Sequence, residues 1–335
     1  MVCIAAFIIL ILVGIIVAFL SIFNRALGRK YLKVLKKSWY CFSKRVTLQK
    51  CDTNFADDVK TSILKKVILK KPEWVKPLSI TIEIASVLVV VVTIWSIVEG
   101  AKAGLALWTL GTCNVSQPAN CALGADSCAL DEEGLNWFEE WGEIIGAIPE
   151  RLKTWNVNDY NLTPAYTLGT ENSENLALSI IDPGCSVCRQ SFKNMQTGSF
   201  LENHQLRVVI YPIRNLDGSY RFANSELIAR YIYAADQTVA SKIIEKIFTE
   251  SDENNINYQS VMNSASAGKA KELLDGWLEA WVGKDQAKEI IKRADSDEVK
   301  QTIEHNREIV DNEIKPKGIP TMIYNGGRHL GLFKN

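Results

Sequence analysis

Two cysteines separated by two residues, Cys185 and Cys188, follow an apolar stretch at 176–181 that is typical of a buried strand. A thiolate attacks a disulfide, so a redox cysteine needs an environment that stabilises its charged form. At the first turn of a helix, Cys185 would meet unpaired backbone N–H groups and the positive end of the helix dipole. Cys188, one turn further on, would then attack Cys185 and release a bound substrate. The spacing predicts Cys185 as the nucleophile and Cys188 as the resolving thiol.

An Ile-Pro pair opens a late strand, at Ile319 and Pro320. Proline is tolerated at the start of a strand, where its missing N–H costs nothing. A cis bond before Pro320 would also leave the backbone groups of Ile319 free to pair with an extended substrate chain. We therefore predict that Pro320 is part of the catalytic site, flanked by Ile319 and Thr321 as substrate-binding residues. A plain strand-opening proline is the alternative.

Asp182 stands three residues before Cys185 and has two interpretations. It is a possible proton acceptor for the cysteines, or it is a turn or capping residue with Pro183, which we favour. The three histidines show no spacing typical of metal ligands, and we expect surface or packing roles for them. We predict no metal site, and no cofactor besides the redox-active disulfide.

Two apolar segments, 1–23 and 78–98, are predicted as transmembrane helices. The first contains no charged residue, and the second contains only Glu83, near its start. Both are long enough to cross the hydrocarbon core of a bilayer. A cleaved signal peptide is the alternative for the first segment, but no lysine or arginine precedes its apolar core.

The segment 24–77 between them carries fifteen lysines and arginines against four acidic residues. By the positive-inside rule this loop is cytoplasmic, and both termini are extracytoplasmic. We expect the loop to contact anionic lipid headgroups rather than nucleic acid. The sequence thus predicts a two-pass integral membrane protein whose redox domain lies on the outer face of the cytoplasmic membrane.

Residues 99–165 form a predicted extracytoplasmic segment with three cysteines, Cys113, Cys121 and Cys128, in a stretch rich in Pro, Gly, Asn and Ser. We predict one structural disulfide among these three, since disulfides persist outside the cytoplasm. A zinc site and free thiols are the alternatives, although no histidine stands nearby and the spacings are not those of a zinc knuckle. Three is an odd number, so one cysteine is free or pairs elsewhere, for example with Cys3.

A helix with an apolar aromatic face is predicted at 135–152. Packing on the outer domain and lying in the membrane interface are both compatible with this face. Its polar side is acidic, which favours packing.

Residues 166–335 have the size of one α/β domain. Two β-rich stretches, 176–181 and 206–211, flank a predicted helix and form a βαβ unit. A long helical region follows to about 314, and two strands at 320–324 and 328–332 end the domain, joined by a turn at 325–327.

Several motifs occur here in an order that resembles the membrane-anchored DsbA-like thiol-disulfide oxidoreductases. They are Tyr166-Thr-Leu-Gly169, the strand 176–181, Asp182-Pro-Gly-Cys-Ser-Val-Cys188, a helical insertion and Gly318-Ile-Pro-Thr-Met-Ile-Tyr-Asn-Gly326. The resemblance covers about residues 166–334. It implies a thioredoxin-like fold with a helical subdomain inserted at about 222–315, a redox-active Cys185 and Cys188 pair, and a cis bond at Pro320.

The chain departs from that family at three points. The dipeptide between the cysteines is Ser-Val, without the family's common proline, which leaves the redox potential and the direction of electron flow open. No aromatic residue immediately precedes Cys185. The chain stops at Asn335, just after the predicted hairpin, where the family usually adds a final helix over one sheet face. We expect the helix at 135–152 to cover that face here.

These observations predict an enzyme that forms, isomerises or reduces disulfides in cysteine-containing envelope or secreted proteins. A membrane redox partner would have to regenerate its active site. The alternative is a thioredoxin-fold binding or assembly module whose cysteine pair is structural, since a fold does not determine a function.

Overall fold

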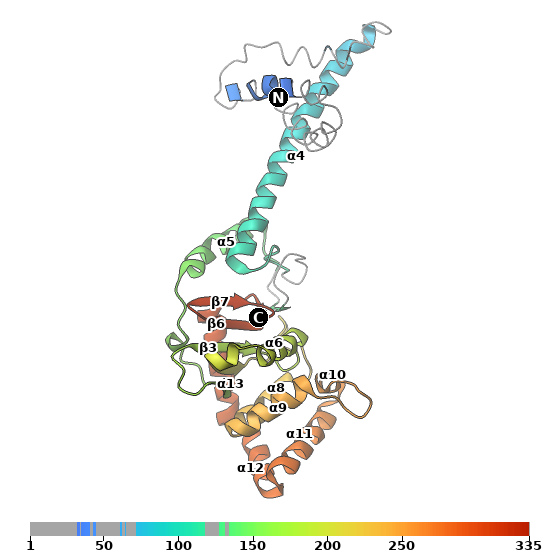
Figure 1. Cartoon of the computed structure of the whole chain (residues 1–335). Helices are drawn as coiled ribbons and strands as arrows, with labels where there is room; N and C mark the ends of the chain where they lie inside the picture. The colour runs from blue at the N-terminus through green and yellow to red at the C-terminus, as the bar shows by residue number, and fades with distance from the viewer. Residues whose placement is uncertain are drawn as a thin grey trace, which may run out of the picture. The chain divides into compact units, whose positions relative to one another are not determined.

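The computed structural model describes residues 72–117, 127–130 and 134–334, with a few helical residues between 32 and 64. The chain divides into two compact units, Met1–Ala101 and Lys102–Asn335. Helix α4 (Val75–Leu110) follows a 3-10 turn, η1 (Pro72–Trp74), and runs from the first unit into the second (Figure 1).

Helix α4 contains the predicted span 78–98. It has 36 residues, and within the described part of the chain it is the one helix long and apolar enough to cross a membrane. The hydroxyl groups of Ser86, Thr93 and Ser96 donate to carbonyl oxygens one turn earlier, which satisfies them inside the helix. The predicted span 1–23 lies outside the described residues, so the two-pass topology stays a prediction.

The second unit is built on a five-stranded sheet in the order β2-β4-β3-β6-β7. Strands β3 and β4 are parallel and joined through helices α6 and α7, while the other neighbours are antiparallel. This order, with its βαβ unit and terminal hairpin, confirms the predicted thioredoxin-like α/β fold. The elements are β2 (Tyr166–Gly169), β3 (Leu176–Ile181), α6 (Ser186–Thr197), α7 (Phe200–Asn203), β4 (Gln205–Ile210), β6 (Thr321–Tyr324) and β7 (Gly327–Leu330).

A helical region separates β4 from the last strands. Its helices form a group beyond the sheet, at the lower end of Figure 1. Side chains of Asp236, Asn257, Ser266 and Ser296 cap four of them by accepting a backbone N–H of the first turn. The elements are α8 (Ser225–Ala234), α9 (Gln237–Thr249), α10 (Tyr258–Ser264), α11 (Ala267–Val282), α12 (Lys284–Ala294), α13 (Asp297–Ile309) and the π-helical turn η4 (Val310–Ile314).

Helix α5 (Trp137–Leu152) does not cover the sheet, so that expectation is wrong. Its one buried side chain, Ile144, packs in a small cluster with Ala106, Leu110 and Val115. Glu140 pairs with Lys102 at 2.8 Å in the same region. The end of α4 thus packs against α5 at Ile144, while Phe138, Ile145 and Leu152 of the apolar face of α5 are exposed. The favoured packing of this whole face stays a prediction.

The chain that follows α5 packs on the sheet in its place. Trp155, Val157 and Tyr160, around the 3-10 turn η3 (Val157–Asp159), belong to the main core. Val157 and Tyr160 line a small cavity together with side chains of β3 and β4. A short irregular segment thus packs on the sheet, where the sequence predicted a helix.

Asn306 of α13 ties this covering segment to the helical region. It is 1% exposed, and its amide bonds both the N–H and the carbonyl of Thr163 (2.8 and 2.9 Å) and the hydroxyl of Tyr233 (2.9 Å). We expect Asn306→Ala to lower the free energy of unfolding by about 1–3 kcal/mol, because partly buried backbone groups lose their partners. Thermal unfolding of the full chain in detergent measures the loss. Asn254→Ala, at an exposed loop position, is the control, and an equal effect of the two variants would contradict the role of Asn306.

Candidate active site

Cys185 lies in the loop between β3 and α6, as the N-cap residue of α6. Its N–H donates to the carbonyl oxygen of Asp182 at 3.1 Å, which closes a tight turn. Glycine is required at position 184, because a Cβ there would lie 2.4 Å from the side chain of Phe222. The turn thus places the Cys185 sulfur at the positive end of the α6 dipole, as the sequence predicts.

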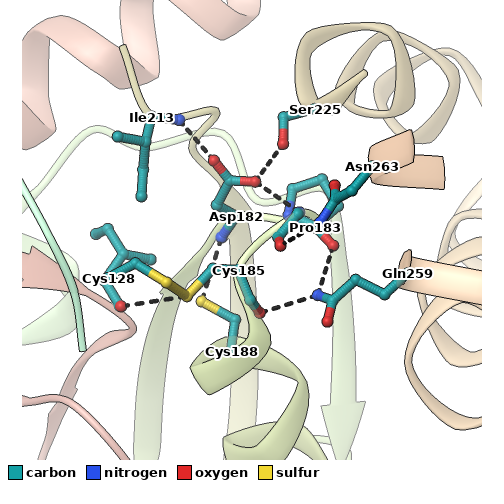
Figure 2. The surroundings of a disulfide bond; sticks show 11 residues. Cys128, Asp182, Pro183, Cys185, Cys188, Ile213, Ser225, Gln259 and Asn263 are labelled. Atoms are coloured by element: carbon teal, nitrogen blue, oxygen red, sulfur yellow. Dashed lines mark hydrogen bonds between the residues drawn. A yellow bond between two sulfur atoms is a disulfide. The ribbon is translucent and has the colours of Figure 1, made fainter. Parts of the chain in front are cut away.

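The sulfur of Cys185 is bonded to Cys128 and not to Cys188 (Figure 2). Cys188, one turn into α6, is a buried free thiol, and both Cys185 and Cys188 are 0% exposed. Cys113 is also disulfide-bonded, and Cys121 lies outside the described residues. Cys128 is therefore the cysteine of the three that pairs elsewhere, because the folded chain brings it to the active site. The predicted disulfide among Cys113, Cys121 and Cys128 stays a prediction for the other two.

The segment that carries Cys128 is paired with the loop before Pro320. Strand β1 (Cys128–Ala129) runs antiparallel to β5 (Gly318–Ile319), with Cys128 opposite Ile319. The N–H of Leu130 extends the pairing by donating to the carbonyl oxygen of Lys317 at 3.1 Å. Backbone groups predicted to bind a substrate chain thus bind a segment of the chain itself.

The residues around Pro320 complete this wall of the site. The Ile319–Pro320 bond is cis, as the resemblance implies. The sulfur of Cys185 lies 3.6 Å from the carbonyl oxygen of Ile319. The hydroxyl of Thr321 is buried and donates to the carbonyl oxygen of Gly318 at 2.7 Å, so in this structure it stabilises the turn.

Asp182 is completely buried, and its carboxylate points toward Ile213 and Ser225 (Figure 2). It accepts the N–H of Gly184 at 2.7 Å, the N–H of Ile213 at 2.6 Å and the hydroxyl of Ser225. The bond to Gly184 is that of an Asx turn, the role favoured from the sequence. Burial raises the pKa of Asp182 to about 6, although these hydrogen bonds and the charge of Arg307 act in the opposite direction.

The environment of Cys188 keeps it protonated. Burial raises the pKa of its thiol well above the ordinary value, and the negative charge of Asp182 raises it further. The N–H of Asp182, 3.5 Å from the Cys188 sulfur, opposes this shift. Cys188 is therefore a thiol at neutral pH and needs a proton acceptor when it attacks.

Two residues of α10, Gln259 and Asn263, hold the active-site loop and were missed in the sequence. The Gln259 amide donates to the carbonyl oxygens of Pro183 (2.8 Å) and Cys185 (2.9 Å), and Asn263 donates to that of Gly184 (2.9 Å). Figure 2 shows both side chains reaching the loop from the same helix. The available signal was a pair of amides at helical spacing beside the buried Met262.

The histidines take packing positions. His204 stacks on Phe200, and His329 stacks on Tyr324. His305 contacts the carbonyl oxygen of Asn161 at 2.9 Å. Among the described residues, no cluster of three or more His, Cys, Asp and Glu side chains is arranged to hold a metal ion.

No protein-family model matches the sequence, and no curated protein matches it. Solved structures with a similar fold include a thioredoxin-like oxidoreductase from Silicibacter pomeroyi DSS-3, with 16% identity and a TM-score of 0.40 over 54% of this chain and 91% of that one. The thiol-disulfide exchange protein α-DsbA2 from Wolbachia pipientis has 16% identity and a TM-score of 0.37, over 52% and 82%. A periplasmic thioredoxin-like protein from Salmonella enterica serovar Typhimurium has 14% identity and a TM-score of 0.33, over 51% and 84%. At these identities the likeness concerns the fold alone.

The bonds from Gln259 give a stability prediction. Gln259→Leu has a similar volume but removes the amide donor to the carbonyl oxygen of Pro183 and one of the two donors to that of Cys185, which keeps the N–H of Arg189. We therefore expect a loss of about 1–3 kcal/mol in the free energy of unfolding. We also expect faster hydrogen exchange at the amides of Cys185 and Arg189, measured by mass spectrometry. Gln301→Leu, at an exposed position of α13, is the control. Unchanged exchange at the loop amides of Gln259→Leu would show that α10 does not hold the loop.

The raised pKa of Asp182 predicts a pH dependence of stability. The folded state holds this proton up to about pH 6, whereas the unfolded chain releases it near its ordinary value of 3.8. The stabilising contribution of protonated Asp182 is therefore complete below about pH 4 and is lost as the pH rises through 6, by about 3 kcal/mol. We expect the difference in unfolding free energy between the natural chain and Asp182→Asn to change across this window, measured by denaturant titration. A difference that is constant from pH 4 to 7 would exclude the shift.

Proposed function

We propose that this chain is a membrane-tethered thiol-disulfide oxidoreductase that acts on cysteine-containing envelope or secreted proteins. One observation carries the proposal: Cys185 is disulfide-bonded to a cysteine in an extended strand paired with Ile319. A nucleophilic cysteine joined to a chain that adds a strand beside it has the geometry of a mixed disulfide with a bound substrate.

The chemistry runs in either direction through that mixed disulfide. In reduction, the Cys185 thiolate attacks a substrate disulfide and releases one substrate thiolate. Cys188 then loses its proton and attacks the Cys185 sulfur, which leaves a Cys185–Cys188 disulfide and the second substrate thiol. In oxidation, a substrate thiolate attacks the Cys185–Cys188 disulfide, and a second substrate thiolate displaces Cys185. Each cycle moves two electrons, which a membrane redox partner supplies or removes.

The positions of the two cysteines support this division of roles. Cys185 is at the start of α6, where the helix dipole favours a thiolate. Cys188 is inside the helix, where burial raises its thiol pKa. Attack by Cys185 and resolution by Cys188 follow from this difference.

Helix α4 supports membrane attachment, since it is long and apolar enough to span a bilayer. The basic segment 24–77 would then lie at the cytoplasmic surface against anionic lipids. This orientation puts the redox domain in a compartment where disulfides persist.

A second function is favoured by one observation. Cys185 is 0% exposed beneath the segment that holds Cys128, as in an inert structural disulfide. In that case the fold would serve as a binding or assembly module.

Trapping in cells separates these two functions. In a Cys128→Ser background, Cys188→Ala leaves Cys185 able to attack but removes the resolving thiol. We expect this double variant to accumulate disulfide adducts with envelope proteins, detected on non-reducing gels and released by reductant. Cys128→Ser with Cys185→Ala is the matched control and should give none. If the Cys188→Ala protein also gives none, the oxidoreductase proposal fails and the binding module takes its place.

A further inference from the structure

The disulfide between Cys128 and Cys185 bears on how the proposed site is regulated. The inference about regulation rests on the proposed function. Three features distinguish residues 127–130 from an ordinary disulfide loop: their backbone pairing, the space made for them, and the free thiol beside the bond.

The backbone pairing covers residues 128–130 of the segment. Cys128 and Ala129 are in register with Ile319 and Gly318, and Leu130 donates to Lys317 at 3.1 Å. The side chains of Cys128 and Leu130 are partly buried against the main core. The segment thus occupies, in extended form, the place predicted for a substrate chain.

The facing strand has room for it. A Cβ at Gly318 would lie 2.5 Å from the Ser127 hydroxyl oxygen and 3.2 Å from the carbonyl oxygen of Cys128. Glycine at position 318 therefore permits the close approach of the segment. On the other side, Lys317 is anchored by Glu143 of α5 at 3.2 Å.

The free thiol of Cys188 supplies a nucleophile that can break the Cys128–Cys185 disulfide. Cys188 follows Cys185 by one helical turn, and it is buried and unbonded. A disulfide with a purely structural role would have no use for a third sulfur at this place.

We propose that Cys128 is a third redox-active cysteine, and that residues 127–130 are a tethered internal substrate that covers Cys185 until Cys188 releases it. In the release step Cys188 gives up its proton and its thiolate attacks the Cys185 sulfur. The Cys128–Cys185 bond breaks, the Cys185–Cys188 bond forms, and Cys128 leaves as a thiolate that takes up a proton. The number of disulfides is unchanged, so no external oxidant or reductant is required.

The consequence is competition within one chain. A tethered cysteine acts at an effective concentration in the millimolar range, so an external thiol at about 10 μM faces roughly a hundredfold excess. The high pKa of the Cys188 thiol prolongs the covered state, because it keeps the attacking thiolate scarce at neutral pH. External chains gain access when the internal strand has been released.

The first test uses the full chain in detergent and a fluorescent ten-residue peptide with one cysteine. Oxidised natural protein and oxidised Cys128→Ser are mixed with about 10 μM peptide, quenched in acid, and analysed for the peptide adduct on Cys185. We expect adduct formation in Cys128→Ser to be faster by on the order of tenfold or more. Peptide mapping of the natural protein should find Cys185 bonded to Cys128.

The second test perturbs the backbone pairing and leaves all cysteines in place. Leu130→Pro removes the N–H that donates to Lys317, and Leu130→Ala keeps this N–H but loses the same side-chain packing. After equilibration in a glutathione buffer, we expect a larger share of Cys185 bonded to Cys188 in Leu130→Pro than in Leu130→Ala. Equal shares would overturn the paired internal strand.

The outcomes separate the inference from the proposed function. If Cys128→Ser and the natural protein form the adduct at the same measurable rate, the internal substrate is overturned while the oxidoreductase stands. If neither protein forms an adduct, and Cys128→Ser also fails to form a Cys185–Cys188 disulfide, both the inference and the proposed function are overturned.

Discussion

The candidate site depends on backbone groups that a sheet leaves unpaired next to a buried sulfur. Strand β5 precedes Pro320 and has only two residues, Gly318 and Ile319, and its partner is the equally short β1. Two residues of pairing are weak by themselves, since isolated two-stranded ribbons are marginal in water. The covalent bond between Cys128 and Cys185 holds the pair together, and the pair holds the bond in place. Any chain that displaces β1 must supply both a strand and a sulfur.

The helical region also helps to hold the loop that carries Cys185. The carbonyl oxygens of Pro183, Gly184 and Cys185 in the active-site loop accept hydrogen bonds from α10, through the side-chain amides of Gln259 and Asn263. The carboxylate of Asp182 satisfies N–H groups from the opposite side. Buried polar groups of this kind are costly unless every partner is present. The position of Cys185 is thus fixed jointly by the sheet, its preceding turn and a helix some seventy residues later.

Local patterns in the sequence predicted the parts of the site that local physics determines. The buried strand before Cys185, the helix that begins with it and the βαβ unit all follow from composition and spacing, and the structure contains them. The partner of Cys128 could not be predicted, because a disulfide depends on which distant segments meet in space. The role of α5 was wrong for a related reason: an apolar helical face shows that a helix packs, but it does not show on what. Gln259 gave too little signal, since one amide on a buried helix face is visible only once its partners are known.

Electrostatics around Cys188 connect these contacts to the chemistry. Ionised Asp182 and deep burial both disfavour a Cys188 thiolate. A scarce thiolate slows resolution of any disulfide at Cys185, whether its partner is external or Cys128. The same environment makes Cys188 a poor leaving group when an incoming thiolate attacks the Cys185–Cys188 bond, since thiols of high pKa leave slowly. Protonation of Asp182, favoured by its raised pKa of about 6, removes the negative charge and weakens this restraint. The buried carboxylate therefore helps to set how long a mixed disulfide at Cys185 persists, in addition to forming the turn that positions this cysteine.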